Sequence, residues 1–109
     1  MTVARRVVER SHEDKVIIGM IMSNRFLKDI IPIYRPEYMK NTYGRIICEW
    51  VLDYFQQYEK APKQHIKDIF EIERARIEEA DESIIEIFLT KLNRHYTEEQ
   101  EINEDYFID

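Results

Sequence analysis

Apolar residues along this chain recur in steps of three and four, which is the spacing of one face of an α-helix. A first helix is predicted over residues 11–30, with Ser11 as its N-cap. A second helix is predicted over residues 43–58, capped by Asn41 or Thr42. Its uninterrupted apolar stripe consists of Tyr43, Ile46, Ile47, Trp50, Val51, Tyr54, Phe55 and Tyr58. We expect this stripe to form a main part of the hydrophobic core.

Prolines and charged residues separate the other predicted elements. Proline disfavours the α region for the residue before it, so Pro32 and Pro36 end the first helix, and Pro36 suits the start of a short helical turn. A third helix is predicted over residues 62–73. The charge-rich stretch after it is predicted to be a connector, and Asp81 is predicted to cap a narrower amphipathic helix over residues 82–96. The apolar stripe of this helix consists of Ile84, Ile85, Phe88, Leu89, Leu92 and Tyr96.

These elements predict a single all-α domain, a compact orthogonal bundle of about five to six helices. The chain has 109 residues, of which 44% are hydrophobic and 35% charged, with two glycines and three prolines. This composition fits one compact helical domain with few loops. We assign residues 1–10 to a flexible N-terminal tail, residues 11–101 to a helical globular head and residues 102–109 to the start of a C-terminal helix.

The last residues of the chain carry the signals of a helix start. Asn103 is a suitable N-cap, the acidic residues after it are favoured by the helix dipole, and Ile102 and Phe107 have the spacing of a hydrophobic staple. A helix of only two turns gains little stability unless it is docked. We therefore interpret the chain as a fragment of a longer protein.

Charge and cysteine content narrow the class of protein. Acidic residues outnumber basic ones by 22 to 16, and the net charge of −6 argues against a nucleic-acid-binding footprint. The single cysteine, Cys48, lies in an apolar helical face and is interpreted as a buried side chain in a protein of a reducing compartment. The longest apolar run, Val16 to Met22, is too short to span a membrane, and no signal peptide precedes it. We expect a cytoplasmic protein.

The sequence contains no arrangement of residues that is typical of catalysis. Gly19 and Gly44 are the only glycines, so no phosphate-binding loop can form, and we exclude ATP hydrolysis by this chain. The histidines His12, His65 and His95 do not have the spacing of metal ligands. Clustered carboxylates have too few apolar neighbours to separate their pKa values. We predict no catalytic residues, no cofactor and no metal.

Residues 13–71 combine an acid-led first helix, a turn with the sequence RPEYM at residues 35–39, an aromatic-rich helix at residues 43–58 and a proline loop at residues 59–62. In this order they resemble the N-terminal domain of DnaB-type replicative DNA helicases. That family commonly has a glycine-containing loop where this chain has residues 72–82. The difference indicates a divergent relative from a phage or a mobile element.

The resemblance implies a non-catalytic oligomerisation and docking domain that acts in DNA replication. It implies a helical head followed by a hairpin, with homo-oligomers (a dimer, or a trimer of dimers in the full-length protein) forming a collar above a ring of ATP-dependent helicase motors. It also implies binding of primase or of a helicase loader. DNA is then contacted only through the parent helicase, and no membrane is involved.

Tyrosine suits protein interfaces because its ring is amphipathic, and this chain has seven tyrosines. Aromatic and apolar residues late in the chain are the least assured of burial within one small head. The candidate partner-binding residues are Tyr96, Ile102, Tyr106 and Phe107.

Two other functions stay open at this stage. The chain fits a stand-alone helical adaptor or regulator without a motor. It also fits a weak DNA-binding helical domain, for which an exposed basic stripe is required. The only loose basic grouping near the first turn consists of Lys28, Arg35, Lys40 and Arg45.

Overall fold

The computed structural model describes the backbone of residues 2–98 and the side chains of residues 12–94. This part of the chain has five α-helices, three short 3-10 helices and no strand, which confirms the predicted all-α class. In chain order the elements are α1 (Thr2–Met22), α2 (Asn24–Ile30), η1 (Pro36–Tyr38), α3 (Thr42–Tyr58), η2 (Lys63–His65), α4 (Ile66–Glu73), η3 (Arg74–Arg76) and α5 (Glu79–Glu98).

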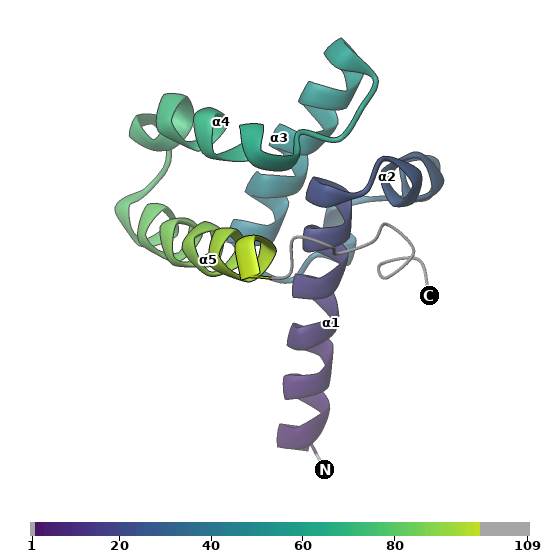
Figure 1. Cartoon of the computed structure of the whole chain (residues 1–109). Helices are drawn as coiled ribbons and strands as arrows, with labels where there is room; N and C mark the ends of the chain where they lie inside the picture. Colours follow the sequence, from purple (N-terminus) through teal and green to yellow (C-terminus); the bar gives the residue numbers. More distant parts are fainter. Residues whose placement is uncertain (1, 99–109) are drawn as a thin grey trace.

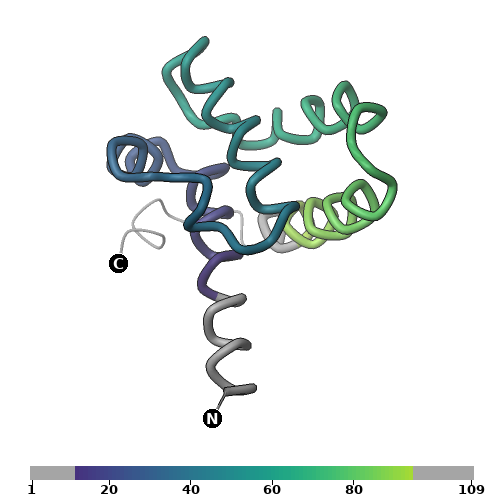
Figure 2. Tube along the Cα trace, turned by 180° about the vertical axis from the view of Figure 1, so that it is seen from behind, coloured from purple at the N-terminus to yellow at the C-terminus, as the bar shows by residue number. Residues whose placement is uncertain are grey.

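The helices form two crossed groups around one core. Helix α1 packs against α3, and α4 and α5 lie across them, as Figures 1 and 2 show from opposite sides. Burial of a large aliphatic side chain contributes about 1.5–3 kcal/mol, so this core is the main source of stability. The buried apolar side chains are Ile17, Met20, Ile21, Met22, Leu27, Met39, Tyr43, Ile47, Cys48, Trp50, Val51, Ala61, Ile66, Phe70, Ile85, Leu89 and Leu92.

Helix α3 confirms the strongest prediction from the sequence. Asn41 is its N-cap residue, and the stripe of apolar side chains faces the core as far as Phe55, apart from Tyr54. Tyr54 lies against the ring of Tyr58, which is 53% exposed. The Trp50 ring lies 6.3 Å from the Phe70 ring, measured between centroids, and so ties α3 to α4. The predicted turn at Pro36 is also present, as η1.

Helix α1 begins earlier than predicted. The backbone is helical from Thr2, so Ser11 lies inside α1 and is not its N-cap. The physical reason is that residues 2–11 contain no glycine or proline, and a residue able to cap a helix does not end one that already passes through it. The flexibility of residues 1–10 stays a prediction.

The single helix predicted over residues 11–30 is interrupted at Ser23. This residue has extended backbone angles, φ −119° and ψ 116°, and its Oγ accepts a hydrogen bond of 3.0 Å from the Phe26 N–H. Ser23 is therefore the N-cap of α2. The bend brings the Phe26 ring over Gly19, where a Cβ atom would lie only 2.8 Å from Phe26 Cδ2. The absence of a side chain at Gly19 is what allows α2 to fold back on α1.

The loop after α3 is held by a side chain from α2. The Ala61 N–H donates a hydrogen bond of 2.7 Å to Asn24 Oδ1. Glu59 and Lys63 adopt φ values of 58° and 52°, in the left-handed region that residues other than glycine rarely occupy. The third predicted helix follows, beginning with η2 after Pro62 and continuing as α4.

The charge-rich connector is shorter than predicted, and α5 starts at Glu79, so Asp81 lies in its first turn and is not its N-cap. The ion pairs of Arg74 explain why the helix starts this early. Its guanidinium binds Glu71 at 3.2 Å, Glu82 at 2.6 Å and Glu86 at 3.5 Å, and it lies 4.6 Å from the centre of a neighbouring aromatic ring. The carboxylates in the first turn are also favoured by the helix dipole. The density of acidic residues predicted a solvated connector here, but three of these carboxylates are paired with Arg74.

Candidate protein-interaction surfaces

The four residues predicted to bind a partner lie outside the described side chains. Tyr96 lies in α5, but the structure describes only its backbone and not its side chain. Ile102, Tyr106 and Phe107 lie beyond the described part of the chain, as does the predicted helix at residues 102–109. Their role as contacts stays a prediction.

An apolar groove lies between α1 and the segment that joins α2 to α3. Its volume is about 200 Å³. Two of its apolar residues, Ile33 and Tyr38, are 66% and 60% exposed. The groove is lined by His12, Glu13, Val16, Ile30, Ile33, Tyr34, Tyr38 and Met39. No periodic pattern predicts this groove, because its residues come from α1, from the end of α2 and from the irregular segment that follows.

The segment beside this groove is fixed by hydrogen bonds from both neighbouring helices. Arg45 of α3 donates from Nε to the Met39 carbonyl oxygen at 2.8 Å and from Nη2 to the Lys40 carbonyl oxygen at 3.3 Å. Glu13 of α1 accepts from the Lys40 N–H and from Asn41 Nδ2, each at 3.2 Å. These bonds hold residues 39–41, directly after the exposed Tyr38.

A partly buried polar contact connects α1 and α3 nearby. The Tyr43 hydroxyl donates a hydrogen bond of 2.6 Å to Asp14 Oδ1. Deeper in the core the Cys48 thiol donates to Met20 Sδ at 3.7 Å. Burial raises the pKa of the Cys48 thiol to about 11, and the nearby Tyr34 hydroxyl offsets part of that rise. The thiol is therefore protonated at neutral pH, which is the state of a structural cysteine and not of a nucleophile.

The outer side of α5 is a second surface with exposed apolar side chains. Ile85, Leu89 and Leu92 of this helix are buried, whereas Ile84 is 43% and Ile87 56% exposed. The sequence placed Ile84 in the buried stripe, and the structure corrects this. Ile87 lies outside the spacing of that stripe. An isoleucine at such a position could have predicted, from the sequence, a second apolar face on this helix.

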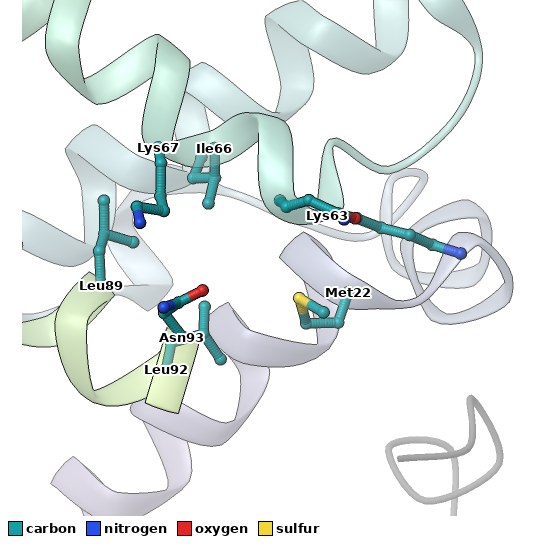
Figure 3. A pocket seen from close by; sticks show the side chains of 8 residues that line it. Met22, Lys63, Ile66, Lys67, Leu89, Leu92 and Asn93 are labelled. Carbon is teal, nitrogen blue, oxygen red and sulfur yellow. The ribbon is translucent and has the colours of Figure 1, made fainter. Parts of the chain in front are cut away.

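A small gap separates α4 from α5. Its lining includes the apolar side chains of Met22, Ile66, Leu89 and Leu92 and the polar residues Lys67 and Asn93, whereas the end of the Lys63 side chain extends away from it (Figure 3). Its volume of about 20 Å³ has room for little more than a water molecule. Sites for small molecules have volumes of roughly 300–1,000 Å³. This gap is therefore a packing defect between helices and not a ligand site.

Groups for chemistry do not come together in the described residues. Within residues 12–94 no cluster of three or more His, Cys, Asp or Glu side chains could hold a metal ion. His65 lies 3.6 Å from Asp68 on an exposed face, and His12 lies at the edge of the groove. The side chain of His95 lies outside the described part of the chain.

The basic residues considered for DNA binding are only partly brought together. Lys40 and Arg45 line the same shallow hollow beside η1, but the guanidinium of Arg45 is bound to backbone carbonyl groups. Lys28 lies in the last turn of α2, and Arg35 precedes η1. These positions do not form the continuous basic stripe that phosphate binding requires.

Comparison with known proteins identifies no relative of this chain. No family model matches the chain, and neither a curated protein nor a solved structure matches it. Within residues 2–98 no helix combines the length and the apolar character needed to cross a membrane.

Proposed function

We propose that this chain is a non-catalytic oligomerisation and protein-docking domain of a DnaB-like replicative helicase, which takes part in DNA replication by assembling the helicase collar and binding primase. The observation that carries the proposal is the exposure of large apolar side chains on rigid elements. Ile33 and Tyr38 stand on backbone turns, in which their N–H groups donate hydrogen bonds of 3.0 Å to the Ile30 and Arg35 carbonyl oxygens. Ile84 and Ile87 stand on a regular helix. Exposed apolar groups that are held in place suit protein contacts.

The link to replicative helicases is supported by the order of elements. The resemblance rests on an acid-led first helix, a turn with proline, an aromatic-rich helix and a proline loop. The described chain has these in the same order, with the turn as η1 and the loop at residues 59–62. The collar, the motor and primase binding are parts of the proposal that this order supports only through the resemblance.

Two measurements on the full chain test the proposal. Sedimentation across a wide range of concentration should show reversible formation of dimers or larger species. Addition of the helicase-binding domain of a primase from the same source should then produce a heavier complex. A chain that stays a single copy at high concentration and does not bind the primase domain contradicts the proposal.

A control separates a protein-docking role from weak DNA binding. The wild-type chain should bind a single-stranded oligonucleotide no better than a variant with Lys40→Gln and Arg45→Gln. Salt-sensitive binding that these substitutions abolish supports the DNA-binding alternative instead, because phosphate contacts depend on counterion release.

A further inference from the structure

The exposed side of α5 has a regular arrangement along the helix. We call it the α5 outer seam, and its residues follow one another at alternating steps of four and three. They are Ala80, Ile84, Ile87, Lys91 and Arg94. All are exposed, and none is acidic, although the chain as a whole has a net charge of −6. Alternating steps of four and three are the spacing of a helix that packs along a second helix.

The position of α5 leaves this seam accessible. Helix α5 lies at the edge of the helical body, beside α3 and next to the end of α4 (Figures 1 and 2). Its buried side chains face the core, so the outer seam points away from the described helices. Small residues at one end, Ala80 and the exposed Ser83, leave room for the close approach of another helix.

The charges at the two ends of α5 are opposite. Glu79 stands at the first turn, and Lys91 and Arg94 stand near the other end. None of these three side chains forms an ion pair with another side chain of the described part of the chain, whereas Glu82 and Glu86 are held by an arginine. The unpaired charges at the two ends of α5 are therefore complementary to each other.

We propose that the α5 outer seam is a self-association surface that receives α5 of a second copy in antiparallel orientation. This inference rests on the proposed function and specifies the interface for it. In this orientation Ile84 of each copy meets Ile87 of the other at the centre. Arg94 then lies opposite Glu79 of the second copy, because both lie roughly 10–13 Å from the centre at 1.5 Å per residue.

A parallel arrangement of the two α5 helices does not pair these opposite charges. In a parallel pair Arg94 meets Arg94, and Lys91 meets Lys91, so like charges face each other. The antiparallel pair also sets the two helix dipoles in opposite directions. Charge complementarity therefore selects a second copy in one orientation as the occupant of the seam.

The apolar centre is tested with Ile84→Gln combined with Ile87→Gln, because glutamine keeps the helix propensity while removing the apolar contact. The dissociation constant of the dimer, measured by sedimentation, should rise at least tenfold. The matched control is Ile72→Gln, since Ile72 is 68% exposed but lies on α4. The dissociation constant of the Ile72→Gln dimer should stay within twofold of the wild-type value. Unchanged circular dichroism and unfolding temperature show that the variants fold.

The orientation is tested by mixing two charge-reversal variants. Glu79→Arg alone places arginine against arginine in the pair, and Arg94→Glu alone places glutamate against glutamate. Each should dimerise more weakly than the wild type. An equimolar mixture should regain association, because the heterodimer pairs Glu79 with Arg94 at one end and the two reversed charges at the other.

The outcomes distinguish this inference from the proposed function. If the wild-type chain associates and neither the isoleucine variants nor the mixture behave as described, the α5 outer seam is not the interface, while self-association stands. A heterodimer that does not recover in the mixture argues that the seam is covered by something other than a second copy, such as the C-terminal residues of the same chain. A wild-type chain that never associates overturns both.

Discussion

At the scale of single residues, Ser23 has a larger effect than its size suggests. Its hydroxyl caps α2 at the point where α1 ends, in a fully buried position. Among the described helices with an assigned N-cap residue, only α2 has one whose side chain accepts a hydrogen bond from a backbone N–H of the helix. This hydrogen bond therefore supports the bend between the two helices, together with the space that Gly19 leaves for the Phe26 ring.

Replacement of Ser23 by alanine should lower stability. Loss of a capping hydroxyl typically costs about 1 kcal/mol of the free energy of unfolding, which corresponds to roughly 4–8 °C in unfolding temperature for a domain of this size. The same substitution at Ser83, an exposed residue within α5, is the matched control and should change stability by less than about 0.5 kcal/mol. Equal effects at both positions, measured by thermal unfolding, contradict the capping role.

Cys48 predicts a dependence of stability on alkaline pH. Burial raises the pKa of its thiol from an ordinary value of 9.0 to about 11, so the folded state holds the proton more tightly than the unfolded chain. This contribution is complete below the unfolded pKa and is lost as pH rises from about 9 to about 11, by an amount on the order of 2 kcal/mol.

The test compares the wild type with Cys48→Ala in urea unfolding between about pH 8 and pH 11. The wild type should lose more stability over this range, whereas the alanine variant should start lower, because of the missing contacts, and fall less steeply. Burial also raises the pKa of Tyr34, and the neighbouring Cys48 raises it further, so the alanine variant keeps only the burial part of the Tyr34 contribution. The difference between the two curves therefore reports the coupled pair of Cys48 and Tyr34. Parallel curves contradict the expected role of the thiol.

At the scale of elements, the junction of α4, η3 and α5 depends on Arg74. Replacement by alanine removes one guanidinium from three carboxylates and from the ring of Phe70. We expect faster amide hydrogen exchange in η3 and in the first turn of α5, because the carboxylates left there repel one another.

The control for this change is Arg76→Ala. Arg76 is largely exposed and, among the described side chains, pairs only with Glu73 at 3.7 Å, so its loss should leave exchange at the junction unchanged. If both variants exchange at the same rate as the wild type, Arg74 does not fix the start of α5.

The elements also show what sequence pattern could and could not predict. Helix α3 was predicted closely because its stripe is continuous and bounded by Asn41 and Pro62. The break at Ser23 was missed because apolar residues continue on both sides of it, and only the capping ability of serine distinguishes it. The start of α5 was missed because the pairing of Glu82 with Arg74 is a tertiary contact that a count of charges does not contain.

The candidate surfaces were predicted less well than the fold. Periodicity assigns residues to a buried face, and it assigned Ile84 to that face although it is exposed. The groove beside Tyr38 depends on how a turn sits against α1, which no local pattern specifies. The late aromatic residues proposed from the sequence lie outside the described side chains.

At the scale of the whole molecule, the C-terminal aromatic residues give a separate prediction. If Tyr106 and Phe107 are part of the self-association surface, changing both to serine should weaken or abolish association and leave a folded chain. Sedimentation gives the mass, and circular dichroism gives the helix content. Loss of the fold shows instead that both side chains belong to the core, and unchanged association assigns the interface elsewhere.

Trp50 gives this molecule a natural optical reporter. It is the only tryptophan in the chain, it is 8% exposed, and its ring contacts Phe70 across the junction of α3 and α4. Its fluorescence therefore reports whether these two helices are docked, at a site separate from the outer side of α5. Unfolding and assembly can then be followed independently in one sample without any added dye, with emission reporting the core and mass reporting the number of copies.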